Sequence, residues 1–330
     1  MSENPNVGFK KHKIKSFQGY LDVVKKIKSE EETVWFRGQS KAWQRLVPSA
    51  IRDNYAIADQ FGRPMDPHGG AARGEAVAIL PFPTMLQKFK ELAITYLGEY
   101  LRAEPKNDLE WYFLAQHYGV PTTLLDWSTD PLIALFFATQ SNIDPKMIIP
   151  VDEAINDFNR NSFSRYGASV FVMDPKKVNA HVGEHIWNNS EKPFTEVINI
   201  AKDNVYDHFK RYLDEDVESR FMMPFCVLGS PIDRRICRQS GNFTIHGSQV
   251  APLDYYSDVQ VLLHKIFIPY SCFEEIKDWL NVLDVTEESV YGDGKLQSLV
   301  SSIGSEARNK FNEKLDQLKA EYRLAAVQRK

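Results

Sequence analysis

The chain has 330 residues, of which 43% are hydrophobic and 25% charged, so it can bury the core of one large domain. Its formal net charge of −4 provides no overall positive field to attract nucleic acid or an anionic membrane. Three cysteines without C-x-x-C spacing argue against a disulfide framework or a thiolate zinc site, and they favour a cytoplasmic location. No apolar run approaches the roughly 20 residues needed to cross a bilayer, so no membrane partner is expected.

The first elements alternate between helical and β patterns. Apolar residues at helical spacing follow Ser16 and predict a helix over residues 17–28 with Ser16 as its N-cap. The β-branched and aromatic run at 33–38 predicts a strand with Arg37 at its C-terminal end. The density of Gly and Pro over residues 53–84 indicates a long irregular insertion.

Helices dominate the next part of the chain. An apolar stripe predicts an amphipathic helix over residues 85–101. A second helix over 109–119 is expected to end at Gly119, because glycine tolerates the left-handed conformation of a C-terminal cap. Asp130 and Pro131 form an N-cap and first-turn pair, which predicts that a buried apolar helix starts there.

The second half of the chain completes a mixed pattern of strands and helices. Strands are predicted at 168–175, 240–247 and 258–269, and helices at 195–213 and 272–283. These elements together predict an α+β domain over residues 1–300, with a mixed sheet core and flanking helices. A C-terminal amphipathic helix over residues 301–330, most regular from Ser305 onward, should dock on this body, bind a partner or mediate self-association.

Familiar catalytic motifs are absent from the chain. It contains no G-x-G-x-x-G opening a helix, no G-x-x-x-x-G-K-[ST], no H-E-x-x-H and no G-x-S-x-G. Rossmann, P-loop, zincin and α/β-hydrolase interpretations therefore lose their support, and no metal site is predicted.

Two charged residues are candidates for a site or for a structural ion pair. Arg37 carries a rigid fork of donors that suits a phosphate or carboxylate, and its alternative role is a pair with an acidic residue. Asp126 lies between Leu125 and Trp127, so burial would require a partner. Arg37 is the obvious partner, and that pairing would make both residues structural.

Other polar residues also have two interpretations. His117 could act as a general base or contact a ribose, or it could cap the carbonyls of its own helix. Ser128 and Thr129 stand at the start of a helix, where they could meet a phosphate or ribose or act as plain caps. Gln239 follows Arg234, Arg235 and Arg238, and this segment could be a surface turn with a solvated basic face.

Three segments resemble the FRG domain, a family of bacteria and phages named for its Phe-Arg-Gly motif. They are WFRGQS at 35–40, LAQHYGVPTTLLDWSTDPLIALFFA at 114–138 and RRICRQSGNF at 234–243. Their order along the chain agrees with the family.

A weaker resemblance connects the same segments to ADP-ribosyltransferases, in which a strand ends in aromatic-Arg-Gly and a serine motif precedes a helix. This resemblance implies an ADP-ribosyltransferase-like fold in which Arg37 holds NAD and Ser128 orients the nicotinamide ribose. In ADP-ribosyltransferases a third motif supplies a glutamate. Gln239 is its best positional analogue in this chain, but a neutral amide lacks the charge of a carboxylate. Asp126 is the remaining motif acid that could oppose the positive charge developing on the ribose.

The resemblances imply an NAD-dependent ADP-ribosyltransferase-like protein that modifies a protein or nucleic acid, as a toxin or phage-defence effector. One alternative is a non-catalytic nucleotide-sensing or protein-interaction module. Another is a nucleic-acid-directed toxin that uses a histidine as acid and base and arginines on phosphates. The expected catalytic residues are Asp126, His117 and Gln239, and the expected cofactor-binding residues are Arg37, Gln39, Tyr118, Ser128 and Thr129.

Overall fold

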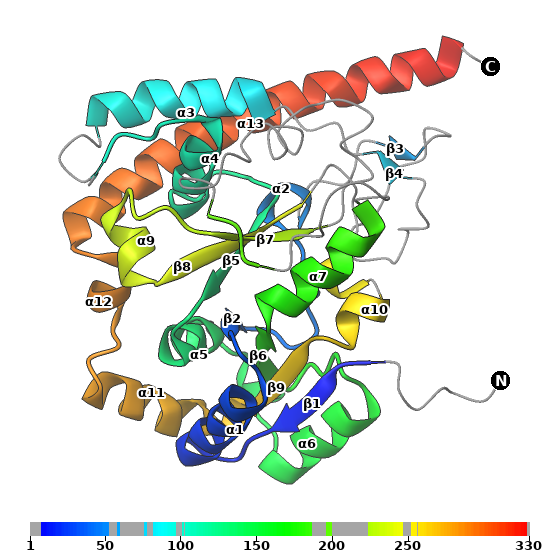
Figure 1. Cartoon of the computed structure of the whole chain (residues 1–330), viewed down its shortest axis with the longest axis vertical. Coiled ribbons are helices and arrows are strands. Elements are labelled where there is room, and N and C mark those ends of the chain that lie inside the picture. The colour runs from blue at the N-terminus through cyan, green and yellow to red at the C-terminus, as the bar shows by residue number, and fades with distance from the viewer. Residues whose placement is uncertain are drawn as a thin grey trace.

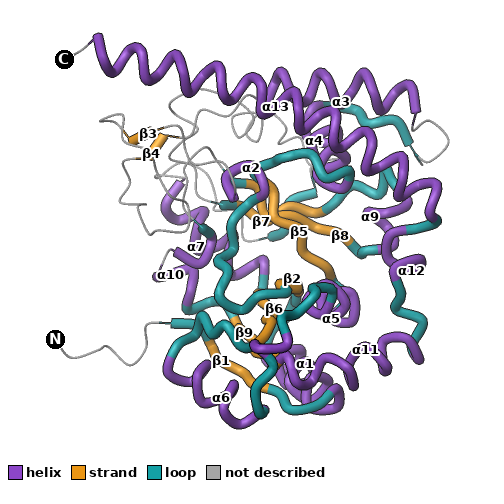
Figure 2. Tube along the Cα trace, turned by 180° about the vertical axis from the view of Figure 1, so that it is seen from behind, coloured by secondary structure: helices purple, strands orange, loops and turns teal. Residues whose placement is uncertain are grey.

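The computed structural model describes most of the chain, and Figures 1 and 2 show it from opposite sides. The described residues are 8–52, 58–59, 76–77, 82–96, 101, 103–186, 196–199, 224–246, 252–255 and 257–328. Within this part of the chain, helices surround a mixed β-sheet, which confirms the predicted α+β class. None of the helices described is both long and apolar enough to span a bilayer.

The central sheet has seven strands in the order β1-β9-β6-β2-β5-β8-β7. Strand β1 runs parallel to β9, and all other neighbouring pairs are antiparallel. The strands are β1 (Lys10–Lys13), β2 (Trp35–Gln39), β5 (Leu124–Ser128), β6 (Gly167–Met173), β7 (Phe225–Leu228), β8 (Gly241–Ile245) and β9 (His264–Pro269). A separate two-stranded ribbon pairs β3 (Ala58–Asp59) with β4 (Ala76–Val77).

Helices cover both faces of the sheet and, among the described residues, enclose two large apolar cores and a smaller cluster around Phe158 and Phe267. The first core joins α1 (Phe17–Glu30), α5 (Pro131–Thr139) and α11 (Phe273–Val282) to strands β2, β6 and β9. The second joins α3 (Phe82–Tyr96), α4 (Asp108–His117) and α13 (Gly294–Gln328) to β5, β7 and β8. The remaining helices are α2 (Ser49–Arg52), α6 (Val151–Arg160), α7 (Pro175–Ile186), α9 (Arg234–Arg238), α10 (Ser257–Gln260) and α12 (Glu287–Tyr291), with 3₁₀ turns at Pro145–Met147, Leu253–Tyr255 and Tyr270–Cys272.

The predicted helix caps are confirmed. The Ser16 hydroxyl accepts a hydrogen bond of 3.1 Å from Gly19 N at the start of α1. Asp130 Oδ1 accepts one of 2.7 Å from Leu132 N at the start of α5. Gly119, two residues after α4 ends, adopts a left-handed φ of +70°. Short side chains that bond the first turn thus fix where two of the helices begin.

Several predicted elements were wrong or incomplete. The predicted strand over 258–269 begins only at His264, because its first residues form α10, and short apolar runs fit either structure. Residues 196–199 are not helical, and Ile198 instead forms a bridge to Val227. The rest of the helix predicted over 195–213 lies outside the described residues, as does the 53–84 insertion apart from β3, β4 and the start of α3.

The C-terminal helix is present and docks on the body. Helix α13 begins at Gly294, earlier than the start predicted at residue 301, and packs along α3. Both figures show its second half extending past the end of α3. Ile303, Ala307 and Phe311 of α13 are buried in the second core, so the apolar stripe read in the sequence faces the protein's own body there.

Candidate functional site

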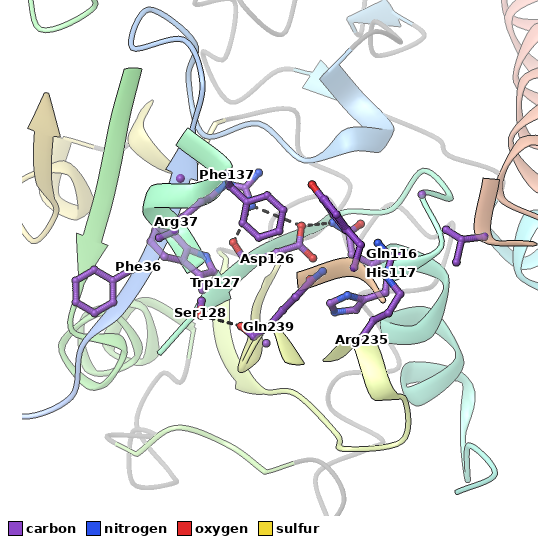
Figure 3. A pocket seen from close by; sticks show the side chains of 16 residues that line it. Phe36, Arg37, Gln116, His117, Asp126, Trp127, Ser128, Phe137, Arg235 and Gln239 are labelled. Carbon is purple, nitrogen blue, oxygen red and sulfur yellow. Dashed lines mark hydrogen bonds and ion pairs between the residues drawn. The ribbon is translucent and has the colours of Figure 1, made fainter. Parts of the chain in front are cut away.

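A cavity of about 320 Å³ opens between the two halves of the sheet. Figure 3 shows side chains from β2, β5, α4 and the α9–β8 segment around it. The residues that line it are Phe36, Arg37, Gly38, Gln116, His117, Gly119, Asp126, Trp127, Ser128, Ala134, Phe137, Arg235, Gln239, Gly241, Tyr291 and Val300.

The cavity forms because β2 and β5 diverge. These strands pair at one position only, Phe36 with Ser128, whereas β2 pairs with β6 over five positions. Gly38 continues β2 beyond this point and lies directly against α5. A Cβ at Gly38 would overlap the carbonyl oxygen of Ala134 and lie 2.7 Å from Ala138 N. The glycine of the Phe-Arg-Gly motif therefore sets the close approach of α5 to the sheet.

Arg37 spans the gap between the two strands. Its Nη1 donates a 2.7 Å hydrogen bond to the Asp126 carbonyl oxygen and lies 3.6 Å from Asp126 Oδ2. The Arg37 side chain is only 14% exposed. The structure thus contains the Arg37–Asp126 ion pair that the sequence left as an alternative, while Arg37 also lines the cavity.

The Asp126 carboxylate is held in one orientation. Gln116 Nε2 donates to Asp126 Oδ2 at 2.7 Å, and Gln116 Oε1 accepts a hydrogen bond from the Thr122 hydroxyl. The Thr122 hydroxyl in turn accepts one of 3.2 Å from Leu124 N, which fixes the orientation of the Gln116 amide. Both side-chain contacts of Asp126 use Oδ2, so Oδ1 accepts no hydrogen bond from a described residue. The carboxylate is 40% exposed and is available to a ligand in the cavity.

His117 lines the cavity as a buried neutral imidazole. Burial lowers the pKa of His117, and the nearby Asp126 carboxylate opposes that shift only in part. His117 Nε2 has no hydrogen-bond partner among the described residues. The ring meets Phe243 edge-on, with 5.5 Å between ring centroids, which fixes its orientation. The lowered pKa favours the neutral form of an imidazole that lines the cavity.

Arg235 brings a second guanidinium to the cavity, from α9. Its residue surface is 8% exposed, and its Nε and Nη1 have no hydrogen-bond partner among the described residues. The guanidinium carbon lies 5.5 Å from the ring centroid of Tyr291 and 6.0 Å from that of Tyr118. Burial lowers the pKa of Arg235 despite the neighbouring tyrosines and Asp233.

One wall of the cavity comes from the C-terminal part of the chain. Tyr291 ends α12 and Val300 belongs to α13, and both line the cavity. A Cβ at Gly304 of α13 would overlap the Tyr118 carbonyl oxygen, so this glycine lets the helix lie against the end of α4. Arg308 Nη2 donates to the Gly119 carbonyl oxygen at 2.6 Å. The docked helix therefore completes the site as well as the core.

Five of the eight residues predicted from the sequence line the cavity: Arg37, His117, Asp126, Ser128 and Gln239. Three do not line it. Gln39 Nε2 donates to the Arg45 carbonyl oxygen at 2.9 Å, and the Tyr118 hydroxyl donates to Asp233 Oδ2 at 3.0 Å. Thr129 is exposed beyond the end of β5, with its N–H directed to the Ser240 carbonyl oxygen.

Ser128 and Gln239 connect two walls of the cavity. The Ser128 hydroxyl donates to the Gln239 carbonyl oxygen at 2.7 Å and accepts from Asp130 N at 3.0 Å. Gln239 Nε2 points to the Val290 carbonyl oxygen at 3.4 Å. The Ser128 hydroxyl is thus both a donor and an acceptor within the protein, and its bond to Gln239 connects the end of β5 to the turn after α9.

Sequence reasoning missed three residues of the site. The sequence left Arg234, Arg235 and Arg238 together, either on a solvated face or on nucleic-acid phosphates. The structure separates them, because Arg235 is buried while Arg234 and Arg238 are exposed. Gln116 and Tyr291 were not among the residues predicted from the sequence. Arg235 and Ile236 both face inward from the short helix α9, which the local sequence RRICRQSGNF does not reveal.

The fold and cavity together define an α+β protein with a partly open cavity that carries two guanidinium groups and one carboxylate. Residues 32–146 match the family model of the FRG domain. The match includes Arg37, Gln116, His117 and Asp126, whereas Arg235 and the C-terminal wall lie outside it. No curated protein and no solved structure matches the chain.

Proposed function

We propose that the cavity binds NAD and that the protein transfers ADP-ribose from NAD to a macromolecular target. The supporting observation is the Asp126 carboxylate, the one carboxylate among the described residues that line the cavity. Gln116 and Arg37 orient it through Oδ2 and leave Oδ1 open. A fixed negative group in a partly enclosed site is what cleavage of a glycosidic bond requires.

The proposed reaction breaks the bond between the nicotinamide nitrogen and C1′ of the ribose. Nicotinamide leaves with the electron pair, and positive charge develops on the ribose opposite Asp126. A nucleophile of the target then bonds to C1′ and loses its proton. The neutral ring of His117, with Nε2 facing the cavity, contacts a ribose hydroxyl or accepts that proton.

One observation favours a second candidate function, a nucleotide sensor without catalysis. Arg37 contacts both the carbonyl oxygen and the carboxylate of Asp126, as expected of a scaffold. A partly exposed pair of this kind holds one geometry of the strand ends without taking part in chemistry. This candidate requires binding of NAD without release of nicotinamide.

The direct test is to incubate the purified protein with a cell lysate and NAD labelled on its adenylate phosphate. We expect nicotinamide release and a labelled macromolecule, and both should be lost in Gly241→Val. Gly241 lines the cavity, and a Cβ there would lie 3.4 Å from His117 Nε2, so valine fills the space without removing any charged group. Nicotinamide is measured by chromatography and the labelled target by gel electrophoresis.

Gly294→Val is the matched control, because a Cβ at Gly294 meets nothing within 4 Å. It should keep wild-type turnover, and thermal unfolding of both variants reports on the fold. Binding of NAD without turnover by the wild-type protein would support the sensor instead. Equal turnover in folded Gly241→Val and wild-type protein would place the reaction outside this cavity.

A further inference from the structure

Arg235 has an unusual environment for an arginine. Its side chain is buried between two tyrosine rings, with Tyr291 on the cavity wall and Tyr118 behind it. Its Nε and Nη1 are buried and have no hydrogen-bond partner among the described residues. Figure 3 shows the side chain directed into the site beneath His117.

The neighbouring carboxylates are already engaged by other groups. Asp233 Oδ1 accepts from Arg235 N at 2.7 Å and Ile236 N at 3.3 Å, and its Oδ2 accepts from the Tyr118 hydroxyl. Asp126 is held by Gln116 and Arg37. Among the described residues that line the cavity, two guanidinium charges thus face one carboxylate, and Arg235 is the cation without a hydrogen-bonded anion.

Leaving a buried cation without hydrogen bonds is unfavourable, because the charge has lost water and gained no replacement. Tyrosine faces compensate only in part for the lost water. The planar guanidinium lies 5.5 Å and 6.0 Å from two tyrosine ring centroids, and its fork of donors suits the oxygens of an oxyanion.

We propose that Arg235 is the anion anchor of the cavity and holds a phosphate group of the nucleotide ligand. That the nucleotide is NAD rests on the proposed function. The role of Arg235 in binding a phosphate group does not depend on it. Arg37, the arginine that the sequence assigned to this task, is committed to Asp126. The site thus divides its two arginines between different roles: Arg37 orients the carboxylate, and Arg235 binds the diphosphate.

The test is a calorimetric titration of inorganic pyrophosphate, ADP-ribose and adenosine into wild-type protein and Arg235→Met. Removing charge-assisted hydrogen bonds should weaken binding of pyrophosphate and ADP-ribose by roughly tenfold to hundredfold and leave adenosine unaffected. Arg234→Met is the matched control, because Arg234 precedes Arg235 in the same helix and is exposed. Arg234→Met should bind pyrophosphate and ADP-ribose with the affinity of the wild-type protein.

The melting temperature of the unliganded variant distinguishes an arginine that binds a ligand from one that stabilises the fold. Arg235→Met removes an unpaired buried charge, so the unliganded variant should melt at or above the wild-type temperature while losing the shift produced by pyrophosphate. Arg235→Lys, which keeps the charge but not the fork, should recover part of the pyrophosphate affinity.

Pyrophosphate binding that is unchanged in Arg235→Met, or lowered equally in Arg234→Met, overturns the inference. A lower melting temperature of unliganded Arg235→Met with no recovery of affinity in Arg235→Lys also overturns it, by assigning the side chain to the core. None of these titrations requires turnover. An inactive protein that binds pyrophosphate through Arg235 would therefore reject the transferase and retain the anchor.

Discussion

Replacing Gly38 with valine is expected to lower the free energy of unfolding by about 3 kcal/mol or more. The new side chain would overlap the Ala134 carbonyl oxygen and press on Ala138 N, and both atoms belong to the backbone of α5. A backbone clash cannot be relieved by a rotamer change, so α5 must move away from β2. Such a loss is a large part of the roughly 5–15 kcal/mol that stabilises a typical domain.

Urea unfolding of Gly38→Val and Gly294→Val measures this effect. Gly294 is also helix-associated but faces open space, so its replacement should change the unfolding free energy by less than about 1 kcal/mol. Similar midpoints for the two variants would mean that α5 does not depend on the glycine of the Phe-Arg-Gly motif. The cavity would then owe its shape to other contacts.

Signals that act within a few residues made part of this fold predictable. The caps at Ser16 and Asp130 and the left-handed Gly119 are local features of sequence, and all three are confirmed. The strand that carries Arg37 was recognised because β-branched and aromatic residues stand together there.

The pairing of distant segments was not predictable in the same way. Strand β5 was not assigned, because Asp126 interrupts its apolar run, and its regularity comes from five paired positions on β8. Likewise, no local pattern distinguishes Arg235 from Arg234. Burial of Arg235 depends on Tyr291, the last residue of α12, which packs against α9 although it lies more than 50 residues further along the chain.

The second prediction concerns the carboxylate of Asp126. Asp126→Asn should reduce NAD turnover by roughly 100-fold to 1000-fold, the range for removal of one preorganised electrostatic group. The new amide keeps the shape of the side chain, and its oxygen can still accept from Gln116. The unfolding free energy should change by less than about 1 kcal/mol, since the carboxylate is 40% exposed and lies 3.6 Å from Arg37.

Asp130→Asn is the matched control, because it removes the same charge four residues away and asparagine caps a helix as well as aspartate does. Its turnover and stability should both match the wild-type protein. Binding of ADP-ribose, measured alongside turnover, separates chemistry from affinity: a catalytic carboxylate predicts lost turnover with retained binding in Asp126→Asn. Full turnover in Asp126→Asn would instead assign the carboxylate to Arg37 as a structural partner, and the open Oδ1 would have no part in the reaction.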